Sequence, residues 1–319
     1  MTASPLSLGY LVFEASRLPD WQRFCQQVLG LGAPLVNIDG SQGWQIDGAS
    51  QRLIVQPGPA DDIAAIGFEC ADDAALDAVL ARLESAGSPA RPADIPLRKA
   101  RRVQRLYTLR DPEGNAVELF TGLAPAAQPF ASPFFPSGFC TGEGLGLGHA
   151  VLVARDLERL EAFYMALPGF AVTERLAART GPIEVRGTFL HCNRRHHSLA
   201  LLALPLGKRL HHFMLQAREL PSVGTAYERA RQLKVPISLG LGQHPAPDGT
   251  FSFYGATPSG FDFEIGALTR EINPGGWQEQ HTGETSAWGH QPTWRLRMRM
   301  AAGLLRHRTG LLRRRRAKV

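Results

Sequence analysis

Two histidines and one glutamate in the second half of the sequence have the residue types of a metal site. They are His149, His212 and Glu264. Two imidazoles and one carboxylate on one side of an iron(II) ion form a facial triad, which leaves coordination positions open for other molecules. Zinc prefers closed or nearly closed tetrahedral sites and is a poorer match, although the ligand types alone exclude neither zinc nor Mn(II).

An internal duplication singles out these three positions. Residues 9–24 align without a gap on residues 148–163, and the likeness continues through both halves. The first half has scaffold residues where the second has the candidate ligands: Tyr10, Gly67 and Glu118. A single histidine beside a strand is more often a core or surface residue than a ligand, and a glutamate recurs in both halves. Three coincidences on one duplicated scaffold nevertheless favour a metal site in the second half alone.

The duplication also predicts the elements that position the three side chains. Apolar residues recur every three or four positions over 18–28 and 157–167, which predicts one helix with a buried face after the first strand of each half. A second strand and helix follow in each half, and a turn then leads to a final strand ending in the glutamate. We therefore predict an α+β fold in which each half contains two strand–helix–strands units in mixed sheets.

The length of 319 residues allows two ordinary domains. We place a metal-free N-terminal domain at residues 1–125 and a catalytic domain at residues 146–292. Residues 126–145 are rich in Pro, Ala, Ser and Gly and are expected to be a linker with little structure of its own.

The net charge of +6 belongs to the end of the chain. Residues 293–319 contain ten Lys or Arg and no acidic residue, and without them 25 basic residues face 29 acidic ones, a net charge of −4. The folded part thus gives no electrostatic support for binding nucleic acid. For this basic tail we expect a disordered or loosely helical, solvated end, with an anionic membrane surface as the alternative.

The compartment is predicted from what the sequence lacks. It has no basic segment followed by an apolar one at its start, and no apolar run of membrane length. The four cysteines are scattered without a CxxC pair. They suggest reduced thiols in a cytoplasmic protein, which suits a ferrous enzyme.

Several motifs resemble a known family. The stretch from His244 through Tyr254 to Glu264 resembles the signature of type I extradiol dioxygenases of the vicinal oxygen chelate superfamily, although the gap between His244 and Tyr254 is one residue longer, as if by an insertion at residues 245–249. Further stretches are similar to 2,3-dihydroxybiphenyl 1,2-dioxygenases, and the likeness extends to about Pro292. These stretches are residues 146–149, 189–198, 208–216 and 288–290.

The resemblance implies a fold of four βαβββ modules, two per domain, each pair forming a half-open barrel. It implies Fe(II) on His149, His212 and Glu264, and a homo-oligomeric protein. The reaction would cleave the ring of a bicyclic or 3-substituted catechol, such as 2,3-dihydroxybiphenyl, by inserting both atoms of O2. A chelating diol needs two open positions on the metal and dioxygen needs the third.

The resemblance also implies roles for three more residues. His197, rather than its neighbour His196, matches the histidine of the substrate pocket, and would stabilise bound oxygen and then deliver a proton. Tyr254 would hydrogen-bond a diol oxygen, and His244 would act as an acid, a base or an orienting group. Without the motif, a surface position would be preferred for His197, and a packed strand position would be as well supported for Tyr254 as the role in binding. We expect apolar walls from Val151, Phe189 and Leu204, and we assign His290 no role.

Two alternatives share this scaffold. A glyoxalase-like metalloenzyme would usually need a second carboxylate among its ligands. A binding protein related to those that sequester bleomycin needs no metal, and the three candidate ligands argue against it, whereas the fold alone does not decide.

Overall fold

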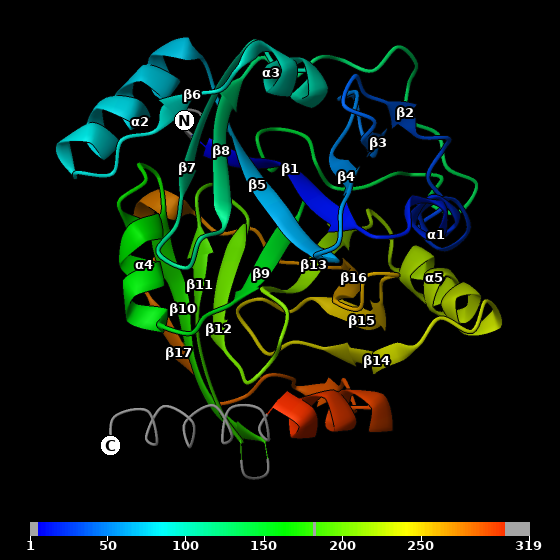
Figure 1. Ribbon diagram of the computed structural model, residues 1–319. Coiled ribbons are helices and arrows are strands. Elements are labelled where there is room, and N and C mark those ends of the chain that lie inside the picture. Colours follow the sequence, from blue (N-terminus) through cyan, green and yellow to red (C-terminus); the bar gives the residue numbers. More distant parts are fainter. Residues whose placement is uncertain (1–5, 181–182, 304–319) are drawn as a thin grey trace, which may run out of the picture.

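Two mixed β-sheets, one for each half of the chain, form the framework of the molecule (Figure 1). The computed structural model describes residues 6–180 and 183–303. Within this part, the first sheet has eight strands in the order β2-β3-β4-β1-β5-β8-β7-β6. The second has ten, in the order β17-β10-β11-β12-β9-β13-β16-β15-β14-β18. No helix in these residues is long and apolar enough to cross a membrane.

The first half contains two modules in which a strand is followed by a helix and three strands. The first module is β1 (Leu6–Ala15), α1 (Leu18–Arg23), the π-helix η1 (Phe24–Val28), β2 (Leu35–Val36), β3 (Gln42–Trp44) and β4 (Leu53–Pro57). The second is β5 (Asp62–Cys70), α2 (Asp73–Ser85), β6 (Arg91–Pro92), the added helix α3 (Ile95–Arg101), β7 (Arg105–Arg110) and β8 (Ala116–Thr121).

The second half repeats this order. Its first module is β9 (His149–Val153), α4 (Leu157–Met165), β10 (Ala171–Thr180), β11 (Ile183–His191) and β12 (Leu199–Ala203). Its second is β13 (Leu210–Gln216), α5 (Leu220–Gln232), β14 (Ile237–Gln243), β15 (Phe251–Ala256) and β16 (Asp262–Ala267). The 3-10 helix η2 (Pro274–Gly276), β17 (Gln280–Thr282) and β18 (Trp288–Gly289) follow. The expected fold of four βαβββ modules is confirmed.

The helices form where the apolar periodicity predicts them. In α4, Leu157, Leu160 and Tyr164 are buried at spacings of three and four, and the Asp156 side chain caps the first turn by accepting from the Arg159 N–H. The first helix differs from its counterpart because its second turn is the π-helix η1.

One apolar core runs through both halves and supports the strand that carries His212. The Phe13 ring on β1 lies 5.2 Å from the Phe213 ring on β13. At the same junction, the Asp62 carboxylate at the start of β5 accepts hydrogen bonds from the backbone N–H groups of Arg209 and Leu210. The first half therefore contacts β13 through both the apolar core and these hydrogen bonds.

Residues 126–145 form no named helix or strand, as expected of a linker, but they are not loose. Phe135 and Phe139 are buried, with ring centroids 4.6 Å apart. The buried Arg195 side chain donates to the carbonyl oxygens of Leu145 and Gly146, which ties this segment to the loop before β12.

The first half has an arginine where the second half gathers imidazoles. Arg101 donates from Nε and Nη2 to the two oxygens of Glu118 at 2.9 and 3.1 Å, and the Tyr10 hydroxyl donates to the same carboxylate. The Tyr10 ring fills the space beside Gly67, where even a Cβ atom would collide with it. No room remains for an imidazole at residue 67, and the Glu118 charge already has a counter-charge.

We predict that Arg101→Met lowers the free energy of unfolding by about 3 kcal/mol, because it leaves Glu118 as a buried charge without a cation. The double variant Arg101→Met, Glu118→Met should recover much of that loss. Urea unfolding measures both, with the exposed Lys99→Met on the same helix as control. A single variant within 0.5 kcal/mol of the parent (roughly the spread of surface substitutions) would contradict this account.

Candidate metal centre and cavity

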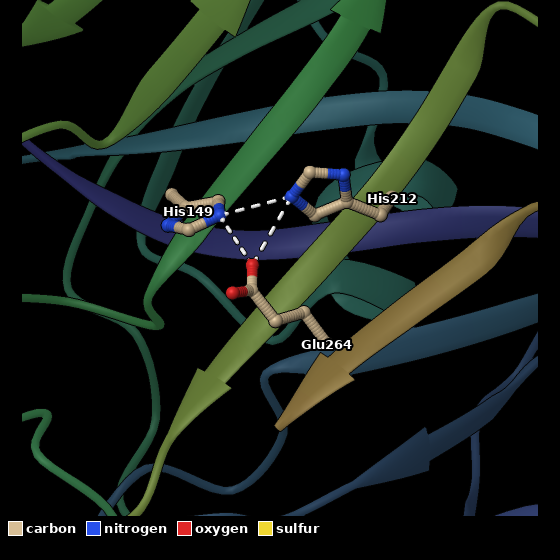
Figure 2. Close-up of side chains that lie close together, drawn as sticks. All are labelled: His149, His212 and Glu264. Atoms are coloured by element: carbon tan, nitrogen blue, oxygen red, sulfur yellow. Dashed lines mark hydrogen bonds and ion pairs between the residues drawn. The ribbon is translucent and has the colours of Figure 1, made fainter. Parts of the chain in front are cut away.

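His149, His212 and Glu264 point toward one another from neighbouring strands (Figure 2). The Nε2 atoms of the two histidines lie 3.1 Å apart, and each is 3.1 to 3.2 Å from Oε2 of Glu264. All three side chains are buried. The structure therefore brings together the three residues that the sequence singled out.

The pairing of three strands explains this convergence. The central strand β13 lies between β9 and β16, and its Met214 is in register with both His149 and Glu264. Paired residues point to the same face of a sheet, and so do residues two apart on one strand. His212 therefore shares a face with His149 and Glu264.

The chemistry of this cluster fits a divalent cation. Glu264 is fully buried, and neither carboxylate oxygen accepts a hydrogen bond within the described chain. Burial acts to raise the pKa of Glu264, but the neighbouring imidazoles of His149 and His212 lower it well below its usual value. A buried carboxylate that stays ionised needs a cation. An open-sided metal bound by two Nε2 atoms and one carboxylate oxygen meets that need.

His197 lies beside the cluster, in the loop between β11 and β12. Its ring centroid is 4.1 Å from that of His149 and 4.9 Å from that of Phe189. Burial and the adjacent His149 imidazole lower the pKa of His197 well below its usual value. A neutral imidazole at this point can accept a proton.

The neighbouring His196 contacts His197 through their Nδ1 atoms at 3.0 Å and lies 3.6 Å from the Glu174 carboxylate. Burial raises the pKa of Glu174 to about 7. With Asp248, the two histidines form a second group of potential ligand atoms. No sequence pattern pointed to Glu174 or Asp248, because they come from different elements without common spacing.

His244 and Tyr254 lie on the other side of Glu264. His244 Nε2 is 2.8 Å from the Tyr254 hydroxyl and 3.7 Å from Glu264, and its Nδ1 contacts the Thr285 carbonyl at 2.8 Å. Burial acts to lower the pKa of His244, but Glu264, Asp248 and the Thr285 carbonyl together raise it to about 9. The expected insertion at residues 245–249 forms a turn that leaves His244 in place.

Two more histidines reach the cavity. The His290 ring lies 4.6 Å from that of His244 and its Nε2 contacts the Ser252 hydroxyl, so His290 packs against the site rather than only holding the C-terminal segment. His211 is next to His212 at an irregularity in the pairing of β13 with β9, which lets both neighbours line the cavity.

The cluster sits at one end of a cavity of about 320 Å³ with mainly apolar walls. Val151, Phe189 and Leu204 line it as expected. The sequence did not reveal the other apolar residues of the wall: Leu176, Val185, Leu202, Leu206, Leu239, Leu296 and Met300. A larger hollow of about 840 Å³ lies between the halves and contains none of the histidines, so the smaller cavity is the candidate site.

Two protein families match parts of the chain. Residues 146–265 match the glyoxalase/bleomycin resistance protein/dioxygenase superfamily. Residues 8–58 match the family described as dihydroxybiphenyl dioxygenase BphC D1.

Whole proteins match over most of their length. A biphenyl-2,3-diol 1,2-dioxygenase of Paraburkholderia xenovorans (strain LB400) is 39% identical over 290 residues, which cover 89% of this chain and 95% of that protein. An iron-dependent extradiol dioxygenase of Rhodococcus jostii (strain RHA1) is 34% identical over 89% of this chain and 96% of its own. The crystal structure of BphC, a halotolerant catechol dioxygenase, superposes with a TM-score of 0.81 at 31% identity and covers 90% of this chain and 94% of that one. The chain belongs to the extradiol dioxygenases of this superfamily.

Proposed function

We propose that this enzyme uses Fe(II) to cleave a bicyclic or 3-substituted catechol, such as 2,3-dihydroxybiphenyl, by insertion of both atoms of O2. We assign the iron to His149, His212 and Glu264. The observation that carries the proposal is the fully buried Glu264, which has no hydrogen-bond donor among the described residues but has two imidazole nitrogens within 3.2 Å. The naming of a relative as an iron-dependent extradiol dioxygenase supports the metal.

The cavity supports the substrate class because its lining is mainly apolar. Besides the three ligands and polar side chains such as Glu174, Asp248 and Thr285, it is lined by aliphatic and aromatic side chains. His149, His212 and Glu264 would occupy one face of the iron. The positions on its other face would then be open to the diol and to dioxygen. The second ring of a bicyclic diol would leave water for the apolar part, which favours binding.

Tyr254 and His244 form a polar pair for the diol. The Tyr254 ring stands edge-on to His212 with centroids 5.0 Å apart, and its hydroxyl contacts His244 Nε2. The Thr285 carbonyl fixes the other nitrogen of His244. We assign Tyr254 to hydrogen-bond a diol oxygen, and His244, whose raised pKa keeps it protonated near neutral pH, to orient Tyr254 and to act as an acid.

His197 is on the opposite side of the ligands, against His149 and Phe189. We assign His197 to hydrogen-bond the bound oxygen and then to deliver a proton to it. His196 contacts the His197 ring, with their Nδ1 atoms 3.0 Å apart. The other nitrogen of His196 lies 3.6 Å from the Glu174 carboxylate.

We further propose domains at residues 1–125 and 146–292, a linker at 126–145 and a tail at 293–319. We also propose a homo-oligomer located in the cytoplasm. Buried thiols at Cys25 and Cys70 support a reducing compartment. Light scattering of the purified chain measures the oligomer, and a monomer at micromolar concentration would contradict that part.

The reaction is tested by loading the chain with Fe(II) without oxygen and then adding 2,3-dihydroxybiphenyl in aerated buffer. We expect a yellow ring-cleavage product with one O2 consumed per diol. Bound iron without turnover of this diol or of simpler catechols would refute the proposed reaction, and activity with Mn(II) alone would correct the metal.

We predict that His212→Ala abolishes both iron binding and turnover, because it removes one of three ligands. His281→Ala is the control, since its side chain is 74% exposed on β17. Iron content by metal analysis and oxygen uptake are measured on the same samples. Iron retained with full activity in His212→Ala would refute the ligand assignment.

We predict that His197→Gln keeps its iron but lowers kcat by about 10² to 10⁴, the usual contribution of a positioned acid or base. The amide keeps a polar group in the loop but cannot transfer a proton near neutral pH. Steady-state kinetics at saturating diol and oxygen measures the change. A kcat within threefold of the parent would show that His197 transfers no proton in the slow step.

A further inference from the structure

The segment after β18 crosses the open side of the second sheet and then turns into a helix. Pro292 forms a bridge with Leu239 of β14, and Thr293 donates to the carbonyl oxygens of Ser238 and Ile237. Residues 294–303 are helical, and the Arg297 N–H donates to the Thr293 carbonyl at the start of this helix. Figure 1 shows the helix in red beside β14. This order differs from the solvated end expected for residues 293–319, of which 304–319 lie outside the described residues.

One face of this helix belongs to the cavity of the metal centre. Leu296 and Met300, one turn apart, both line the cavity, and Leu296 is only 8% exposed. The opposite face carries Trp294 and Met298, which are 69% and 62% exposed. The helix thus turns one apolar pair to the candidate site and leaves a second apolar pair exposed.

An ion pair fixes the helix to the strand that carries Glu264. Arg299 Nη1 lies 2.8 Å from Oδ1 of Asp262, which is 2% exposed. Asp262 is two residues before Glu264 on β16 and in register with His212 on β13. Burial raises the pKa of Asp262, and the Arg299 guanidinium opposes that rise.

The far end of the helix meets the loop between β12 and β13. A Cβ atom on Gly303 would collide with the carbonyl oxygen of Pro205, so only glycine fits this approach. The neighbouring Leu204 and Leu206 also line the cavity. The helix therefore runs from β14 to this loop and covers the cavity between them.

We infer that helix 294–303 is the outer wall of the substrate pocket, and that Leu296 and Met300 contact the part of the diol remote from the metal. The inference rests on the proposed function, since it assigns the apolar end of that site. The superfamily match ends at residue 265, so this wall is built from residues beyond it. The ligand class it selects is a catechol with a bulky apolar substituent.

The test compares 2,3-dihydroxybiphenyl with unsubstituted catechol in the iron-loaded full-length chain. We expect Leu296→Ala combined with Met300→Ala to raise the anaerobic Kd for the bicyclic diol about tenfold or more. The Kd for catechol should stay within threefold. Met298→Ala, on the exposed face of the same helix, is the matched control and should change neither. Calorimetry without oxygen gives these values whether or not the diol turns over.

A second pair of variants tests the ion pair. Arg299→Gln should weaken binding of the bicyclic diol and speed amide hydrogen exchange over residues 294–303, whereas the exposed Arg297→Gln should do neither. If the double variant weakens binding of both diols equally, or of neither, the assignment of the helix as the pocket wall is refuted. If the parent binds 2,3-dihydroxybiphenyl tightly but does not cleave its ring, the proposed reaction is refuted, whereas the assignment of the helix as the pocket wall is not.

Discussion

A buried glutamate carboxylate, on β8 in the first half and on β16 in the second, is the constraint from which the rest of the site follows. Burying a charge is costly unless a counter-charge lies beside it. In the first half Arg101 supplies that counter-charge to Glu118, and Tyr10 adds a hydrogen bond. In the second half no arginine among the described residues pairs with Glu264, whose ion-pair partners are the imidazoles of His149, His212 and His244. The same fold therefore yields a closed ion pair in one half and a place for a metal cation in the other.

The first half supports the strand that carries one of the candidate ligands of the second half. Phe13 packs on Phe213, and Asp62 holds the backbone at the start of β13. His212 is on that strand, so its direction depends on a core that both halves share. A metal centre needs its ligands held within fractions of an ångström, and strands buried on one side by another sheet supply that rigidity better than loops. The first half, which has Tyr10 and Gly67 at the equivalent positions, thus still supports the strand that carries His212.

The sequence was most informative where two copies could be compared. Tyr10 and Gly67 in the first half align with His149 and His212 in the second, which indicated candidate metal ligands in the second half alone. Apolar periodicity predicted helices such as α4. It was least informative where a contact joins distant elements. Glu174 and Asp248 reach His196 from a strand and a turn that share no spacing with it. The strands β17 and β18 have three and two residues, too few to give a periodic signal.

The basic tail shows why composition can mislead about structure. A like-charge block usually stays solvated, because repulsion opposes packing. Here the first arginines are spaced by apolar residues, so a helix can turn Leu296 and Met300 inward while Arg299 meets the buried Asp262. One ion pair then outweighs repulsion that water already screens on the exposed face. Because Leu296 and Met300 line the cavity and neither is one of the three candidate metal ligands, changes at these two positions can alter which diol fits while the proposed ligand set stays the same.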